Sequence, residues 1–189
     1  MSPVEIGTTT GTQQIEPFGF KLGMTKEQIV AALGADAVQK DDGDTLILSK
    51  APKPHPDFSF YLVCVSPSKG FAKVRAVSHE IESNSFGGAI KEKFQETKTA
   101  LAGKYGKPAQ VADGLLSGSI WNEPEDWMMG LANEERLLSA MWKLGGGVLI
   151  GLEAQASSSS EGRICVQYEF ESQFATWIQE HNAKKNDSF

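Results

Sequence analysis

The spacing of hydrophobic positions along the chain changes between the period of a helix and the period of a strand. Thr25 is placed to be the N-cap of a first helix, Gln28 can close a capping box with it, and Gly34 supplies the C-terminal stop. Apolar side chains recur every three or four residues between Phe86 and Tyr105, which predicts a second and longer helix. The pattern predicts helices at 25–33, 86–105 and 173–181, with a short helical turn at 127–131.

Apolar runs of strand length lie between these helices. The clearest is 163–171, where Ile164, Val166, Tyr168 and Phe170 alternate with polar residues, as expected of a strand with one buried face. Connections as short as the Gly145–Gly147 loop join antiparallel strands. The predicted strands are 45–49, 58–65, 74–81, 138–144, 148–154 and 163–171.

This order of elements predicts an α+β fold. We expect an antiparallel sheet, or two small sheets in tandem, covered on one face by helices. A single domain is expected over 17–183, with 17–110 and 111–183 as alternative sub-lobes. Residues 1–16 are polar and predict a flexible N-terminal arm, and residues 184–189 predict a frayed tail.

Charge and hydropathy narrow the classes of function. The chain of 189 residues has a formal net charge of −6 and a pI of about 5.1, which disfavours nucleic-acid binding. No apolar run approaches the roughly 18 residues of a membrane span, so membrane insertion is not expected. The N-terminus lacks the basic start and apolar core of a signal peptide. The sequence therefore predicts a cytoplasmic protein, or a periplasmic one if a signal has been removed.

The reactive side chains form no recognisable catalytic motif. Cys64 and Cys165 lie in apolar strand-like segments and are predicted to be free, buried thiols. His55, His79 and His181 have no nucleophile or carboxylate at a motif spacing. An enzyme would require Cys64, His79 and a carboxylate to meet in one pocket. The sequence predicts no catalytic residues, no cofactor and no metal site.

Two acidic segments differ in what they predict. Asp41, Asp42 and Asp44 lack the later ligands of a calcium loop and are expected to form a solvated turn. The segment 121–130 instead combines acids with tryptophan and methionine, which are enriched at protein contacts. One interpretation makes it a partner-binding surface; the other has Trp121 and Met128 fill the core while the acids face water. The candidate partner-binding residues are Trp121, Glu123, Glu125, Asp126, Trp127, Met128 and Met129.

Residues 18–34 resemble the first helix of proteins with the β-lactamase-inhibitor-protein-like fold and of small outer-membrane-assembly lipoproteins. The resemblance lies in Gly23-Met24-Thr25, Gln28, Ile29 and Leu33-Gly34. It implies a binding or inhibitory module without catalytic residues. We therefore expect a bacterial immunity or inhibitor protein that occludes a cognate toxin enzyme. The alternatives are an envelope assembly or chaperone-like module with its signal removed, or an enzyme with an unrecognised site.

Overall fold

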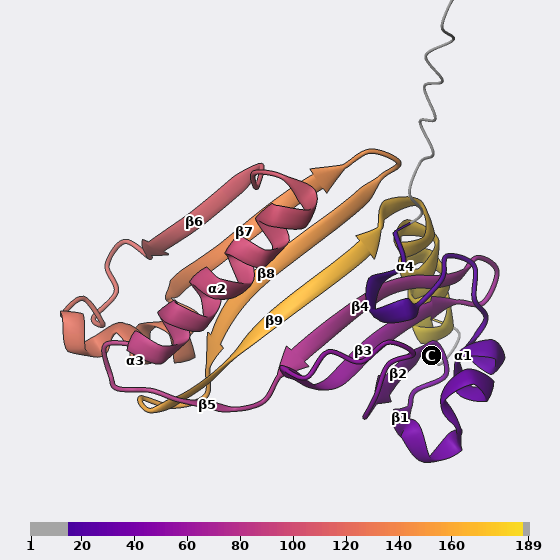
Figure 1. The fold of residues 1–189 in the computed structure, drawn as a ribbon, viewed down its shortest axis with the longest axis horizontal. Helices are drawn as coiled ribbons and strands as arrows, with labels where there is room; N and C mark the ends of the chain where they lie inside the picture. The colour runs from indigo at the N-terminus through magenta and orange to yellow at the C-terminus, as the bar shows by residue number, and fades with distance from the viewer. Residues whose placement is uncertain (1–14, 187–189) are drawn as a thin grey trace, which may run out of the picture.

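The computed structural model describes residues 15–186, and its centre is one antiparallel sheet of nine strands (Figure 1). The order across the sheet is β1-β2-β3-β4-β9-β8-β7-β6, and the short β5 pairs with β9 outside this path. The α+β prediction is confirmed, with one continuous sheet instead of two small ones. The strands are β1 Val38–Asp41, β2 Thr45–Leu48, β3 Phe58–Ser66, β4 Gly70–Ser78, β5 Ile81–Glu82, β6 Gln110–Leu115, β7 Arg136–Leu144, β8 Val148–Ala156 and β9 Glu161–Phe170.

The helices occupy different parts of the sheet. Figure 1 shows α2 lying over the strands of the C-terminal half, with α3 near one end of it and α4 close to β3 and β4. Short 3-10 turns accompany them: η1 Pro17–Gly19, η2 Ala35–Ala37 and η3 Pro124–Asp126. The α-helices are α1 Lys26–Leu33, α2 Gly88–Tyr105, α3 Trp127–Ala132 and α4 Glu171–Asn186.

The predicted caps of α1 are both present. The Gln28 backbone N–H donates to Thr25 Oγ1 at 3.3 Å, and the Thr25 N–H donates to Gln28 Oε1 at 2.9 Å, which completes the capping box. Gly34 ends the helix with a φ of 87°, and its N–H donates to the Val30 carbonyl. These bonds engage Thr25 and Gln28 in stabilising the helix start.

The core lies between one face of the sheet and the helices α1, α2 and α3. Ile90, Phe94 and Leu101 are the buried residues of α2, and Trp142 in β7 is almost fully buried and donates to the Gly106 carbonyl at 2.8 Å. Burying such side chains is the main favourable contribution to folding. Phe86, predicted to begin the apolar face of α2, instead precedes the helix and is exposed.

The prediction that helices cover a single face is wrong, because α4 lies on the other face. Tyr168 in β9 points toward α2, where its hydroxyl lies 3.3 Å from that of Tyr105. Its neighbour Glu169 therefore points the opposite way, and it pairs there with Lys73 of β4. Lys73 also lies over the ring of Phe174 in α4 at 4.3 Å. The α4 helix thus covers polar side chains of the sheet, and none of its own residues is fully buried.

Three further features depart from the prediction. The edge strands β1 and β6 were not expected, since most of their residues are exposed and show no apolar alternation. The α4 helix continues through Asn186, three residues into the expected frayed tail. The expected flexible arm falls mostly on residues 1–14, outside the described part of the chain.

Candidate functional site

Two of the seven candidate partner-binding residues lie in the core. Trp127 and Met128 begin α3 and are buried, so neither can be a surface anchor for a partner. Gly87 has a φ of 74°, and a Cβ there would overlap the Trp127 ring. The ring packs onto this glycine and lies beneath Lys91 Nζ, 4.4 Å from the ring centroid. The core-filling interpretation, which named Trp121 and Met128, holds for Met128, while Trp127 fills the core and Trp121 is only half-buried.

The other members of the segment remain near the surface. Glu123 and Glu125 are exposed, while Trp121, Asp126 and Met129 are half-buried. The η3 turn and α3 hold them at the end of the sheet, against β7 and β8. These five residues remain candidates for contact with a partner.

Of the seven large apolar side chains that are exposed among the described residues, four lie in β6, in the loop that follows it or in β7. Ile120 is 74% exposed and Leu116 is 62% exposed, both in the loop that follows β6. Val111 in β6 and Leu137 in β7 are about half exposed and point to opposite faces of the sheet at this edge, because Val111 pairs with Ala140. We call Val111, Leu116, Ile120 and Leu137, together with the free edge of β6, the β6 surface. Exposed apolar residues on and beside a free strand edge offer contacts for a partner.

The free edge of β6 adds backbone groups to this surface. The Leu116 N–H donates to the Glu135 carbonyl at 2.7 Å, and the register pairs Gly114 with Leu137 and Ala112 with Ser139. Hydrogen-bonded pairs alternate along an antiparallel ladder, so the even-numbered residues bond to β7. The N–H and C=O groups of the odd-numbered residues of β6 therefore point outward, where no described strand pairs with them.

Two hollows border the β6 surface. One of about 400 Å³ lies between β6 and the start of β7, and another of about 590 Å³ lies between the start of β7 and the end of β8. Leu116, Glu134 and Leu137 line both hollows. Glu134 has a φ of 60°, which is uncommon for a residue other than glycine. The surface therefore combines apolar patches with concave space for the side chains of a partner.

The same region carries most of the net charge of the chain. Residues 109–142 contain six acidic residues, and Arg136 is the only basic one. Arg136 is itself engaged, with Nη1 3.7 Å from Asp113 and its guanidinium over the Trp127 ring. The β6 surface is thus flanked by uncompensated carboxylates, which attract a cationic partner.

The structure keeps Cys64 and His79 apart. Cys64 pairs with Lys73 in the β3–β4 ladder, whereas His79 follows the opposite end of β4. Burial raises the pKa of the Cys64 thiol to about 11, so it is almost entirely protonated near neutral pH. Both cysteines are free; Cys165 is buried as predicted, and Cys64 is half-buried. The catalytic group of Cys64 and His79 that the sequence analysis considered is therefore not formed.

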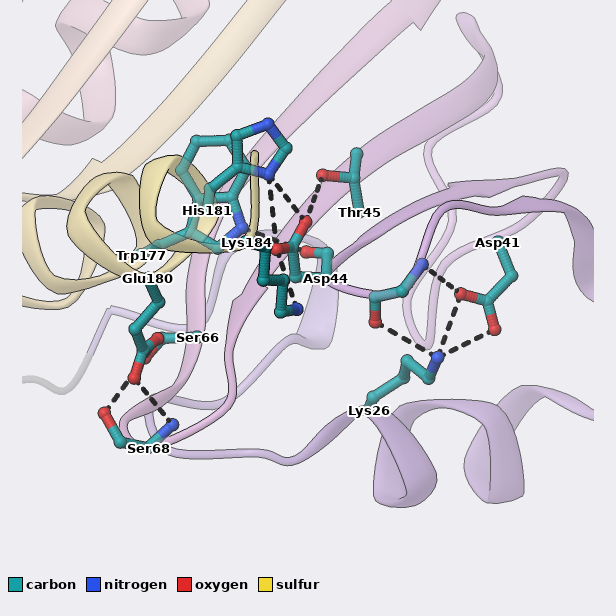
Figure 2. Close-up of polar contacts among 11 residues, drawn as sticks. Lys26, Asp41, Asp44, Thr45, Ser66, Ser68, Trp177, Glu180, His181 and Lys184 are labelled. Carbon is teal, nitrogen blue, oxygen red and sulfur yellow. Dashed lines mark hydrogen bonds and ion pairs between the residues drawn. The ribbon is translucent and has the colours of Figure 1, made fainter. Parts of the chain in front are cut away.

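Asp44 is buried, contrary to the prediction that its turn is solvated. Figure 2 shows the Asp44 carboxylate between His181 and Lys184 of α4. His181 Nδ1 lies 3.1 and 3.2 Å from its two oxygens, and Lys184 Nζ donates at 3.1 Å. The Trp177 indole N–H donates to the Asp44 carbonyl. These bonds attach α4 to the start of β2.

Comparisons of this chain with protein-family models, characterised proteins and solved structures find no match. Among the described residues, no helix is both long and apolar enough to cross a membrane. Residues 15–186 also contain no group of three or more His, Cys, Asp or Glu side chains that could hold a metal ion. The β6 surface, with Trp121, Glu123, Glu125, Asp126 and Met129, is therefore assigned on geometry and charge alone.

Sequence reasoning found the acids of this site but missed its apolar part. Leu116 and Ile120 stand among glycine and serine residues, in a stretch for which the sequence predicts no helix or strand. Large apolar residues in a Gly/Ser loop, with no helical or strand period to bury them, are the signal that could have identified the surface.

Proposed function

We propose that this protein is a non-catalytic protein-binding module, in its specific form a bacterial immunity protein that binds and occludes a toxin enzyme. The observation that carries the proposal is the coincidence of exposed apolar side chains, a free strand edge and uncompensated acids at the β6 surface. Hydrophobic contact supplies affinity at such a surface, while the acids speed the capture of a basic partner.

The thiols support a reducing compartment for this function. Cys64 and Cys165 are both free, and unpaired thiols persist in the cytosol. The proposed site of action is therefore the cytoplasm, where an immunity protein would meet a toxin made by the same cell.

The test pairs the protein with the product of the neighbouring toxin-like gene. Association is measured by biolayer interferometry, and the activity of the partner is assayed with and without the protein. We expect binding and loss of activity in the partner. The immunity role would be refuted if a pull-down recovers only unrelated abundant proteins and the protein does not change the activity of any neighbouring gene product.

Paired variants then locate the surface. The double change Leu116→Asp and Ile120→Asp should weaken binding at least tenfold, because two exposed apolar contacts become charged. The matched control is Leu22→Asp with Ile178→Asp, two exposed apolar residues in other parts of the chain. Equal weakening by both pairs would show that the β6 surface is not the interface.

Charge reversal tests whether the acids affect the association rate more than the dissociation rate. Changing Glu123, Glu125 and Asp126 to lysine should slow association, with a smaller effect on dissociation. Trp127→Ala is excluded from this series, because the buried indole reports on folding and not on contact. Unchanged association of the charge-reversed variant would remove the acids from the proposed site.

A further inference from the structure

A second surface of the molecule has the character of a small-molecule site. It is a cleft of about 340 Å³ between α2, η1 and the loop that precedes β3, with β9 as its floor. We call it the α2 cleft. Its volume falls within the range of ligand pockets, which begins at roughly 300 Å³. It shares no lining residue with the hollows beside the β6 surface.

Aromatic rings form one wall of the α2 cleft. Phe18 lies edge-on to Phe58 at 5.4 Å and to Tyr168 at 5.8 Å, measured between ring centroids. Leu101 of α2 and Val166 of β9 supply the aliphatic surface of the cleft. Phe18 and Phe58 are only partly buried, so they retain surface that a ligand can cover. Edge-on and offset contacts of this kind suit a flat aromatic group.

Phe18 is held in place at a conformational cost. It has a φ of 52°, a region where a bulky residue is a genuine outlier. Its carbonyl accepts the Lys53 N–H at 2.8 Å, and a Cβ on Gly19 would meet the Lys53 backbone nitrogen at 3.0 Å. The turn is therefore tightly docked on the loop that precedes β3, and it fixes the aromatic wall before any ligand arrives.

The two lysines at the mouth of the cleft differ in whether they form ion pairs. Lys93 is paired with Asp57 at 2.8 Å and with Glu96 at 3.5 Å, so two carboxylates share one lysine and the three groups keep one net negative charge. Lys104, farther along the same face of α2, makes no ion pair with a described carboxylate and lies over the Tyr105 ring. It is the cation at this mouth that a ligand anion can engage.

The floor of the cleft carries a neutral donor. The hydroxyls of Tyr105 and Tyr168 lie 3.3 Å apart, and one proton of the two makes the bond between them. Burial raises the pKa of Tyr168, so its hydroxyl remains protonated. Only Tyr168 of the two lines the cleft, and its proton is free for a ligand acceptor when Tyr105 is the donor of this bond.

We propose that the α2 cleft binds a small aromatic carboxylate, with its rings against Phe18, Phe58 and Tyr168 and its carboxylate beside Lys104. A cationic group in the position of the carboxylate is disfavoured, because it would lie beside the like charge of Lys104. This site is independent of the proposed interface on the β6 surface.

The probes for the test share one ring system and differ in charge: 1-naphthoate, 1-naphthamide and 1-naphthylmethylammonium. Isothermal titration of the full chain should give 1-naphthoate a Kd on the order of 0.1–1 mM, as expected for a ligand of this size. We expect the amide to bind about three- to fivefold more weakly, since it lacks one exposed ion pair. The cation should bind more weakly still. No binding of 1-naphthoate, or a cation that binds as tightly, would overturn the proposal.

Variants of residues in α2 test whether 1-naphthoate binds in the α2 cleft. Lys104→Gln should reduce the affinity for 1-naphthoate to that of the amide and leave the amide unchanged. The control is Lys98→Gln on the same helix, where the lysine lies over the Phe94 ring and not at the cleft. Ala100→Trp, at the exposed mouth, should abolish binding of all three probes. Wild-type affinity in Lys104→Gln or Ala100→Trp, or an equal loss in Lys98→Gln, would refute the site.

One measurement is independent of variant folding. Methyl resonances of Leu101 and Val166 in the wild-type protein should shift on titration with 1-naphthoate, because both side chains line the cleft. Shifts confined to methyl groups elsewhere would overturn the assignment, even if Ala100→Trp fails to fold.

Discussion

The attachment of α4 to the sheet gives the sharpest prediction about stability, and it rests on the buried carboxylate of Asp44. Only 2% of Asp44 is exposed, and its carboxylate is bonded by His181, Lys184 and Thr45 (Figure 2). The change Asp44→Asn keeps the shape of the side chain and removes the charge that the Lys184 ammonium and the His181 ring face. Burial alone would raise the pKa of Asp44, but hydrogen bonds from Lys184 and His181 outweigh it, so the pKa lies below its ordinary value.

The expected loss of stability depends on how exposed the side chains of His181 and Lys184 are. A hydrogen bond to a charged group contributes about 1.5–3 kcal/mol when its partners are well buried. The side chains of His181 and Lys184 are 34% and 55% exposed, so water recovers part of their interaction when the charge is removed. We therefore expect Asp44→Asn to lower the free energy of unfolding by about 2 kcal/mol, and Tm by about 4–8 °C for a chain of this length.

The lowered pKa of Asp44 also predicts how the stability difference between the wild type and Asp44→Asn changes with pH. A carboxyl whose pKa is lowered by folding contributes stability that is fully present above its unfolded pKa, near 3.9. That contribution is lost as pH falls through the lower, folded pKa. The difference in stability between the wild type and Asp44→Asn should therefore be constant above about pH 4 and shrink below it.

The assay is urea unfolding followed by circular dichroism from pH 3 to 7, with hydrogen exchange of the α4 amides as a local readout. The matched control is Asp41→Asn. Asp41 also pairs with a lysine, Lys26, at 2.8 Å, but its side chain is 42% exposed, so the loss should stay below about 1 kcal/mol. Equal losses in the two variants, or a loss for Asp44→Asn under 0.5 kcal/mol, would refute the argument from burial.

Three further predictions concern single positions. Gly87→Ala should destabilise the protein by about 3 kcal/mol or more, because a Cβ at a φ of 74° overlaps the Trp127 ring, and thermal unfolding measures it. Its control, Gly103→Ala within α2, meets no atom within 4 Å and should raise stability by up to about 1 kcal/mol. Thr25→Ala should cost about 1 kcal/mol through loss of the capping box, and a loss near zero in urea unfolding would contradict that role. Alkylation of Cys64 by iodoacetamide, followed by mass spectrometry, should be slow at pH 7 and accelerate toward pH 11, and rapid reaction at pH 7 would contradict the raised pKa.

The elements that sequence patterns predicted best are those whose determinants lie close together in the chain. The capping box joins Thr25 to Gln28, three residues away, and the apolar alternation of β9 lies within ten residues. Strand β6 gave no such signal. It lies at the edge of the sheet, where few of its residues are buried, so apolar alternation is not required.

The candidate site was only partly predictable because burial at its centre depends on distant residues. A tryptophan next to acids is equally compatible with a binding anchor and with a core residue. For Trp127, the outcome is decided by Gly87, forty positions earlier, whose missing side chain leaves room for the indole. Nothing in the local sequence of either residue indicates that they meet.

The burial of Asp44 likewise depends on residues that are distant in the sequence. Asp41, Asp42 and Asp44 have nearly the same local sequence, yet Asp44 alone receives His181 and Lys184, which are 137 and 140 positions away. Asp41 instead binds Lys26, and Asp42 binds Lys40 at the surface. A carboxylate can be buried only where cations and hydrogen-bond donors compensate for the loss of water. Because α4 brings such groups to Asp44 alone, Asp44 is the one of the three that is buried. The contrast between Asp44→Asn and Asp41→Asn therefore measures a tertiary effect that no local pattern encodes.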